Sequence, residues 1–406
     1  GRTELATTIF GRDKVLKGKA ILDGKDVTGL STAEVLKAGI YYVPEDRRLN
    51  GVFGISDVAA NTTSSLLRDK KMGGFFLDRK AEKEVAHLTT RRNLTMELDF
   101  NYTSVAGIVA AAEQAGLPIS RHVLNQQELQ MEQSEESIYE HMKSNYRVMA
   151  ECIEPGCKKD LRSTSGLTGG SAYKMRRIAE SGTSLTGSFL SGALYRALAV
   201  SELNASMGRI VAAPTAGSCG ILPAALLTMQ EEKNIPERDC VMSLFTASAV
   251  GMVIANNASL AGAQGGCQAE CGSAAAMAAA AIVELAGGTP RMAGHAIAIA
   301  IKNILGLVCD PVAGLVEIPC IKRNASGVAG AFVAAELALA GIESAIPADE
   351  VIWTMKKVGD AMSSSLKETA EGGLAATPTG RRLHEQVFGT AREPGSGCSG
   401  CGGCAS

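Results

Sequence analysis

The sequence has few aromatic residues and almost no net charge. Aromatic side chains make up 4% of the 406 residues, and 40 basic residues nearly balance 42 acidic ones, which leaves a net charge of -2. A chain without an excess of positive charge lacks the broad electrostatic footprint that binds nucleic acid or acidic lipid. We therefore expect neither nucleic acid nor a membrane as a partner.

No secretory signal or membrane span is predicted either. Residues 1–10 include charged side chains and no continuous apolar core. The longest apolar run, from Ser243 to Ala263, approaches the length of a membrane span, but it contains Asn256 and Asn257 and has no asymmetry of flanking basic residues. We interpret it as a buried helix of a cytoplasmic protein, in which the 11 cysteines are thiols, metal ligands or core residues.

Small residues take the place of the scarce aromatic ones. Alanine and glycine dominate stretches such as "GSAAAMAAAAIVELAGG" from Gly272 to Gly288. Such stretches favour closely packed helices over sheets, which are richer in β-branched and aromatic residues. From about residue 101 onward, apolar residues recur at three- and four-residue steps. The sequence therefore predicts a mainly α fold.

The first 88 residues have a different pattern. The runs "GKAILDGKDVTGL" and "AGIYYVPEDRR", with the helical "STAEVLKAG" between them, predict a small α/β fragment. With "GRTELATTIFG" and "YYVPEDRRLNGVF", this part resembles the ATP-binding subunit of sugar-importing ABC transporters. Because no G-x-x-x-x-G-K-[ST] phosphate loop occurs, we interpret residues 1–88 as a truncated remnant, with a regulatory domain or a nucleotide-binding transporter component as the alternatives. Residues 89–102 form the predicted linker.

Three cysteines lie where helices are predicted to break. Cys267 follows two glycines in "AQGGCQAECG", and Cys309 and Cys320 neighbour proline in "GLVCDPVAG" and "VEIPCIKRN". Backbone N–H groups at broken helix ends are free to bond cluster sulfides or an anionic substrate. Spacing alone leaves two interpretations open: three ligands of an iron–sulfur cluster, or ordinary buried thiols.

A resemblance decides between these interpretations. From about Thr103 to Gly389 the chain resembles the α chain of the iron–sulfur-dependent bacterial L-serine dehydratase. The motifs that carry this resemblance are "SGLTGG" from Ser165, "NASMGRIVAAPTAGSCGILP" from Asn204, "GGCQAE" from Gly265, "KNILGLVCDPVAGLVEIPCIKRNA" from Lys302, "IPADEVI" from Ile346 and "GGLAATPTG" from Gly372.

The resemblance implies a helical catalytic domain at residues 103–390. It also implies that Cys267, Cys309 and Cys320 ligate a [4Fe–4S] cluster, and that L-serine is converted to pyruvate and ammonia. In this reaction the open iron acts as a Lewis acid on the serine hydroxyl. The [4Fe–4S] cluster is therefore the expected cofactor, and L-serine is the expected substrate.

The dehydration also needs an anchor for the substrate carboxylate. The loops "SGLTGG" and "PTAGSCG" offer backbone N–H groups and hydroxyls, with helix capping as the alternative role for each hydroxyl. The residues after Cys320 are a second candidate for binding carboxylate or tuning the cluster, with an exposed charged surface as the alternative. The candidate substrate-binding residues are Ser165, Thr168, Gly169, Gly170, Thr215, Gly217, Ser218, Arg323 and Asn324, and Lys322 is a catalytic candidate.

The base that removes the Cα proton is the least defined part. His295 in "GHAIAIAIKN" is the catalytic candidate, although a histidine in an apolar helical run is also a common core residue. In the resembled family an "SSHT"-like loop of a second domain or a separate β chain brings the catalytic histidine, and that loop is absent from this sequence. The resemblance therefore implies a separate β chain, a homo-oligomer, or both, as partners.

Two further groups of cysteines stand outside the predicted ligand set. Cys271 follows Cys267 by one helical turn and is predicted to lie near it as a supporting or core residue. Cys398, Cys401 and Cys404 have the C-x2-C-x2-C spacing that begins an iron–sulfur binding run, but no fourth cysteine follows. We predict a flexible tail at 391–406, which either caps or delivers the cluster or binds metal without specificity.

Overall fold

The computed structural model describes residues 8–9, 15, 19–22, 25–37 and 102–389. The chain divides into two units, Gly1–Asp99 and Phe100–Ser406. The transporter-like motif at 41–53, the predicted linker up to residue 101 and the cysteine tail lie outside the described residues. Their predicted roles therefore stay predictions.

The first unit contains a hairpin and a short helix. Strand β1 (Ile21–Leu22) pairs antiparallel with β2 (Lys25–Asp26), and α2 (Thr32–Lys37) follows. Ser31 precedes this helix, and its backbone N–H and its hydroxyl both donate to the carboxylate of Glu34. The bond from the N–H is the one that the acidic residue accepts in a capping box. The small α/β fragment predicted for this part is confirmed.

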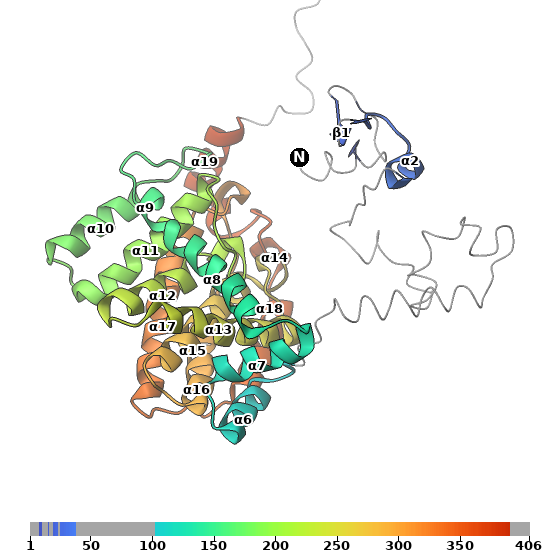
Figure 1. Cartoon of the computed structure of the whole chain (residues 1–406). Helices are drawn as coiled ribbons and strands as arrows, with labels where there is room; N and C mark the ends of the chain where they lie inside the picture. Colours follow the sequence, from blue (N-terminus) through green and yellow to red (C-terminus); the bar gives the residue numbers. More distant parts are fainter. Residues whose placement is uncertain (1–7, 10–14, 16–18, 23–24, 38–101, 390–406) are drawn as a thin grey trace, which may run out of the picture. The chain divides into compact units, whose positions relative to one another are not determined.

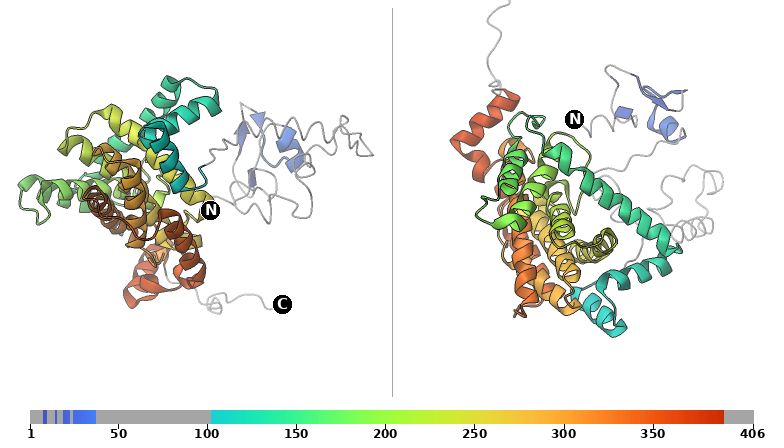
Figure 2. Two further views of the ribbon diagram at one scale, coloured as in Figure 1. Left: turned by 90° about the horizontal axis from the view of Figure 1, so that it is seen from below. Right: turned by 60° about the vertical axis from the view of Figure 1, so that its left-hand side comes forward.

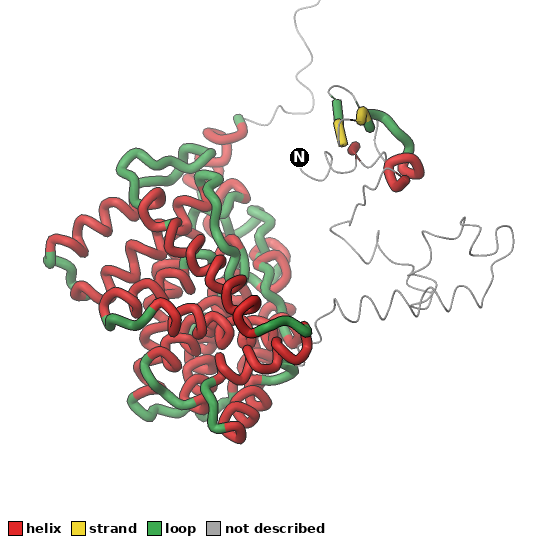
Figure 3. The backbone as a smooth tube through the Cα atoms, viewed as in Figure 1, coloured by secondary structure: helices red, strands yellow, loops and turns green. Residues whose placement is uncertain are grey.

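The second unit is built from helices (Figure 1) that loops connect (Figure 3). The mainly α prediction is confirmed. Its α-helices are α6 (Val105–Ala115), α7 (Ile119–Met131), α8 (Glu135–Glu151), α9 (Ile153–Gly156), α10 (Ser171–Ser181), α11 (Gly187–Ala205), α12 (Ile221–Glu232), α13 (Glu237–Asn257), α14 (Gly262–Gly265), α15 (Ser273–Leu285), α16 (Pro290–Lys302), α17 (Cys320–Leu339), α18 (Ala348–Ala361) and α19 (Pro378–Phe388). Its short helical turns are η3 (Ala216–Ser218), η4 (Gln268–Gly272), η5 (Val312–Gly314), η6 (Ser364–Leu366) and η7 (Gly373–Ala376).

The alanine-rich helix α15 lies in the centre of this unit. Every side chain from Ser273 to Val283 is buried, and α12, α13, α16 and α17 pack around the helix. Figure 2 shows α15, α16 and α17, coloured from yellow to orange, lying side by side. Because these positions are mostly alanine, neighbouring helices approach closely, and each added methylene would overpack the core at a cost of about 1–3 kcal/mol. The small-residue packing predicted from Gly272–Gly288 is thus confirmed.

The long apolar run forms most of α13. By length and composition α13 can cross a membrane, but 67% of its apolar window is buried inside the protein. It packs against α7, α8 and α15. The helix ends at Asn257, short of the predicted Ala263, because the backbone of Ala258 leaves the helical region with a φ of -139° and a ψ of -145°. The Asn257 amide donates to the carbonyls of Val253 at 2.8 Å and Thr103 at 3.0 Å.

Three helix junctions converge on one region of this unit. The turns α14 and η4 pack against α18, and α17 packs against both η3 and η4. The junction before α15, the segment after α16 and the start of α17 therefore lie together. The three cysteines singled out in the sequence lie in these junctions.

Candidate metal centre

Cys267, Cys309 and Cys320 come together from the three junctions. Cys267 immediately precedes η4, Cys309 bridges to Lys367, and Cys320 is the first residue of α17. All three side chains are buried. The sulfurs of Cys267 and Cys309 lie within 4.8 Å of each other, and Cys320 lies close enough to Cys267 to affect its pKa. The predicted proximity of these thiols is therefore present in the fold.

Cys271 joins the same group, and we call Cys267, Cys271, Cys309 and Cys320 the thiol cluster. Hydrogen bonds from Cys271, Cys309 and Cys320 hold the pKa of the Cys267 thiol well below its ordinary value, and the charge of Arg323 acts in the same direction. The hydrogen bond to Cys267, together with burial, raises the pKa of each of the other three thiols. The arrangement favours one thiolate among four sulfurs, and thiolates are the form of cysteine that ligates metal.

Gln268, the neighbour of Cys267, ties the junctions together. Its buried side-chain amide donates to the carbonyls of Gly265 and Met355, both at 2.9 Å. Its carbonyl oxygen accepts a hydrogen bond of 2.9 Å from the backbone N–H of Gly306. These bonds join η4 to α18 and to the segment that leads to Cys309, so the thiols are positioned by a fully bonded polar side chain.

Backbone pairing fixes Cys309 in turn. Its N–H donates to the carbonyl of Leu366 at 2.8 Å, and its carbonyl accepts from the N–H of Glu368 at 2.7 Å. Burial, and after it the negative charge of Cys267, raise the pKa of the Glu368 carboxyl. The segment from 366 to 374 therefore forms one wall beside the thiol cluster.

Arg323 forms a buried ion pair with Asp310. The guanidinium donates to the carboxylate at 2.9 Å and to the carbonyl of Val308 at 2.8 Å, and the two side chains are 15% and 5% exposed. The second carboxylate oxygen of Asp310 accepts from the N–H of Leu374 at 2.9 Å. The predicted site residue Arg323 thus lies beside the thiols, whereas its neighbour Lys322 is exposed.

Asn324 is buried and clamps the start of α17 to the loop "PTAGSCG". Its side-chain amide donates to the carbonyls of Cys320 at 3.0 Å and Gly217 at 2.8 Å. Its side-chain oxygen accepts from the N–H of Gly220 at 2.9 Å. These bonds use the donors and the acceptor of the amide, so in this structure Asn324 positions the loop.

The loop "PTAGSCG" borders the thiol cluster through Glu270. The hydroxyls of Thr215 and Ser218 lie 3.1 Å apart. A carboxylate oxygen of Glu270 and the sulfurs of Cys267 and Cys309 all lie within 4.8 Å of one another. Burial, and then the charge of Cys267, raise the pKa of Glu270 to about 7, although a hydrogen bond with Thr215 opposes the shift.

The loop "SGLTGG" faces a carboxylate of the chain itself. The hydroxyls of Ser165 and Thr168 donate to Glu317 at 2.8 Å and 2.6 Å. Glu317 is buried and lies shortly before Cys320 in the sequence. The candidate anchor loop is therefore attached to the segment that carries the thiols.

Two glycines determine the path of this loop. Gly169 has a φ of 138°, and a Cβ atom there would lie 2.1 Å from the carbonyl oxygen of Leu161. Gly170 has a φ of 76° and is the N-cap of α10. Both conformations are in the region that side chains disfavour, so this turn requires glycine.

His295, the candidate base, lies in a different environment on α16. Its Nδ1 accepts from the N–H of Ser344 at 3.2 Å, and its Nε2 is 3.8 Å from the carboxylate of Glu343. It lines a cavity of about 210 Å³ together with residues of α6 and α18, and none of the cysteines lines that cavity. The structure does not bring His295 together with the predicted ligands.

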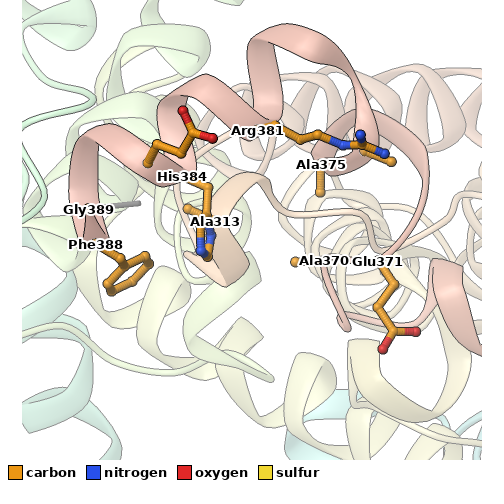
Figure 4. Close-up of a pocket in the computed structure, with 10 residues that line it drawn as sticks. Ala313, Ala370, Glu371, Ala375, Arg381, His384, Phe388 and Gly389 are labelled. Atoms are coloured by element: carbon orange, nitrogen blue, oxygen red, sulfur yellow. The ribbon is translucent and has the colours of Figure 1, made fainter. Parts of the chain in front are cut away.

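A larger cavity, of about 450 Å³, adjoins the segment between Cys309 and Cys320 (Figure 4). Ala313 of η5 lines it on one side, and Arg381, His384 and Phe388 of α19 line it on another. Ala313 lies in the motif "GLVCDPVAG". No sequence pattern singled out Arg381, His384 or Phe388, which lie beyond the motif "GGLAATPTG" on a helix that buries only Gly380.

Sequence reasoning also missed the acidic residues around the thiols. These residues are Glu270, Asp310, Glu317 and Glu368. Three of them, Glu270, Asp310 and Glu317, stand within three residues of a cysteine in a mainly apolar or glycine-rich run. This was a usable signal, because a buried charge is costly without a partner. Glu368 has no cysteine near it in the sequence, so no such signal marks it.

The fold and the site define a class: a helical protein with a buried cluster of thiols of the kind that binds metal. The chain belongs to the serine dehydratase family, since the family model described as "Serine dehydratase alpha chain" matches residues 114–375. The family predicted from the sequence motifs is thereby confirmed.

Individual relatives agree with this assignment. The probable L-serine dehydratase alpha chain of Bacillus subtilis is 49% identical over 290 residues, which are 71% of this chain and 96% of the relative. The L-serine dehydratase alpha chain of Peptoniphilus asaccharolyticus is 45% identical over 281 residues, 69% of this chain and 96% of the relative. The L-serine dehydratase of Streptomyces coelicolor is 40% identical over 276 residues, which are 66% of this chain but only 59% of that relative.

Proposed function

We propose that this chain is the α subunit of an L-serine dehydratase, a lyase that converts L-serine to pyruvate and ammonia. It would hold a [4Fe–4S] cluster on Cys267, Cys309 and Cys320 and act with a separate β chain. The observation that carries the proposal is the convergence of these buried thiols, from three separate junctions, in a chain of the serine dehydratase α-chain family.

The donor set suits an iron–sulfur group. Thiolates are the ligands that such clusters use, and hydrogen bonding favours a thiolate at Cys267. Hydrogen bonds of Gln268 and of the Cys309 backbone hold the donors in place. This preorganisation lowers the cost of assembling the site.

The reaction removes a proton from Cα and the hydroxyl from Cβ of serine. The cluster, when bound, supplies a Lewis acid for the departing hydroxyl. The loss of water leaves aminoacrylate, whose imine tautomer takes up water and yields pyruvate and ammonia. In this proposal Thr215 and Ser218, a hydroxyl pair beside Glu270, would donate to the substrate carboxylate.

A partner chain is proposed as the source of the base. His295 contacts Ser344 and lines a cavity that the cysteines do not line. The relatives from Bacillus subtilis and Peptoniphilus asaccharolyticus are named alpha chains, and the relative from Streptomyces coelicolor extends well beyond the region it shares with this chain. Both facts support a second chain or domain that completes the site.

A single metal ion is the competing occupant. The sulfurs of Cys267 and Cys309 and a carboxylate oxygen of Glu270 are within 4.8 Å of one another, a spacing that one zinc or iron ion can bridge. A chain with such an ion would be a non-catalytic metal protein or a different metalloenzyme. Metal and sulfide analysis separates the two possibilities.

The test is anaerobic purification of the full chain, with and without a β chain, followed by iron, sulfide and zinc analysis and an assay of pyruvate from L-serine. We expect iron and sulfide in equal amounts, visible charge-transfer absorption, and pyruvate formation that depends on the β chain. Cys267→Ser, Cys309→Ser and Cys320→Ser should abolish the absorption, whereas Cys240→Ser, a buried cysteine of α13, should retain it. Zinc without sulfide, or no metal at all, would contradict the proposal.

A further inference from the structure

Glu270 is the one carboxylate that shares a possible metal-binding geometry with the cysteines among the described residues. It lies in η4, a π-helical turn that begins directly after Cys267. Such turns are rare and occur frequently at functional sites. The turn directs a carboxylate oxygen of Glu270 to within 4.8 Å of the sulfurs of Cys267 and Cys309.

Two glycines make room for this carboxylate. A Cβ atom on Gly217 would lie 2.9 Å and 3.1 Å from its two oxygens, and a Cβ atom on Gly262 would lie 3.0 Å from one of them. The Cβ atom on Gly262 would also lie 2.9 Å from the sulfur of Cys309. Neither glycine has a positive φ, so the backbone conformation would accept alanine. Glycine is required at both positions because a Cβ atom would be too close to the Glu270 carboxylate.

Among the residues that the structure describes, no cationic side chain pairs with this carboxylate. Within the described part of the chain, no ion pair includes Glu270, and the buried Arg323 is bonded to Asp310 and Val308. Two other acidic groups nearby already have partners, because Asp310 pairs with Arg323 and Glu317 accepts from two hydroxyls. A cation bound at this position would offset the charge of a carboxylate held against sulfur donors.

We propose that Glu270 supplies an oxygen ligand to the metal group held by Cys267, Cys309 and Cys320, at the coordination position that the three cysteines leave open. This inference rests on the proposed function. A carboxylate is a harder ligand than a thiolate, so it occupies an iron less firmly and yields it to an incoming substrate more readily. Glu270 would thereby protect the open position until substrate arrives.

The competing donor is Cys271, which is buried and hydrogen-bonded to Cys267. A fourth thiolate would bind more firmly than a carboxylate and would hinder access of substrate. Because Cys271 and Glu270 are adjacent in η4, separate substitutions are needed to distinguish them.

The experiment compares the wild-type chain with Glu270→Gln, Cys271→Ala and a matched control, Glu284→Gln. Glu284 is a carboxylate of α15 that accepts from the Ser120 N–H at 3.1 Å and the Thr246 hydroxyl at 2.6 Å, and it belongs to no metal-binding group of described residues. Each protein is reconstituted anaerobically with ⁵⁷Fe and sulfide. Mössbauer spectra and the rate of iron release to a chelator are then recorded without substrate.

We expect the wild type to show an iron component with oxygen ligation, which Glu270→Gln removes and Glu284→Gln retains. Iron release from Glu270→Gln should be at least about tenfold faster, the loss typical when a group that supports a metal is removed. Unchanged spectra and release in Glu270→Gln, or the same changes in Cys271→Ala instead, would overturn the inference. A wild type without iron and sulfide would refute the proposed function itself.

If Glu270→Gln does not fold, Gly217→Ala is the second test. It keeps the carboxylate but places a methyl group 2.9 Å from one of its oxygens, so the side chain must move. The oxygen-ligated component should again be lost, with the circular dichroism spectrum unchanged. A spectrum identical to that of the wild type would count against Glu270 as a ligand.

Discussion

The hydroxyl of Thr168 donates a hydrogen bond of 2.6 Å to the carboxylate of Glu317, 149 residues later in the chain. Ser165 donates a second bond of 2.8 Å to the same carboxylate. Glu317 is buried and precedes Cys320, so these two bonds attach the glycine-rich loop to the thiol-bearing segment. The loop and the metal centre are therefore expected to lose their order together.

Glu317→Gln should destabilise the protein. The amide keeps the size of the side chain but has one oxygen where the carboxylate offers two, and hydrogen bonds to charged groups contribute about 1.5–3 kcal/mol each. We expect the free energy of unfolding to fall by about 2 kcal/mol. Urea denaturation measures this loss, and Glu128→Gln on the exposed face of α7 is the control. Equal midpoints for both variants would show that the Glu317 bonds contribute nothing.

The buried pair of Arg323 and Asp310 should respond strongly to the loss of one partner. Asp310→Asn leaves the guanidinium without its counter-charge in a site where the two side chains are 15% and 5% exposed. Breaking a buried ion pair costs about 3–5 kcal/mol. Asp360→Asn, which breaks the exposed pair with Lys356, should cost less than about 1 kcal/mol. Urea denaturation of both variants measures the free energy of unfolding. A similar decrease in the two variants would contradict the expected difference between the buried and the exposed pair.

Gly169 and Gly166 lie in one loop and allow two effects of an added Cβ atom to be compared: a steric clash and an unfavourable positive φ. Both have positive φ, 138° and 76°, but a Cβ atom at Gly169 would meet the Leu161 carbonyl at 2.1 Å, whereas one at Gly166 would meet nothing within 4 Å. Gly166→Ala should therefore cost only the left-handed backbone penalty, about 1–2 kcal/mol. Gly169→Ala should cost more than about 3 kcal/mol. Comparable melting temperatures would mean that the loop shifts without cost.

Much of the fold followed from local patterns in the sequence. Runs of alanine predicted the central helix α15, and the apolar run from Ser243 predicted the buried part of α13. Helix ends were harder, because they depend on single contacts. At the end of α13, Asn257 bonds to the carbonyl of Thr103, 154 residues away, a contact that no local pattern contains.

The candidate site was predicted only in part, for the same reason. Motifs pointed to Cys267, Cys309 and Cys320, and the fold brings them together. Glu270 was not predicted, since its place depends on a π turn and on space left by Gly217 in a distant loop. The bond between Thr168 and Glu317 likewise exists only once the chain has folded.

His122 on α7 should make stability depend on pH. Burial lowers the pKa of its imidazole from the ordinary value of 6.5. Above that value the side chain is neutral in both the folded and the unfolded state, so it contributes no pH dependence. As the pH falls below 6.5, the unfolded chain takes up a proton that the folded protein resists, and the free energy of unfolding decreases until the pH reaches the lower, folded pKa.

Melting temperatures at about pH 7.5 and about pH 5.5 measure this effect. The wild type should lose more stability between these two conditions than His122→Gln, which has no imidazole to protonate. His141→Gln, a substitution on the exposed face of α8, is the control and should behave as the wild type does. If His122→Gln loses as much stability on acidification as the wild type, then burial of this imidazole has no effect on the pH dependence of folding.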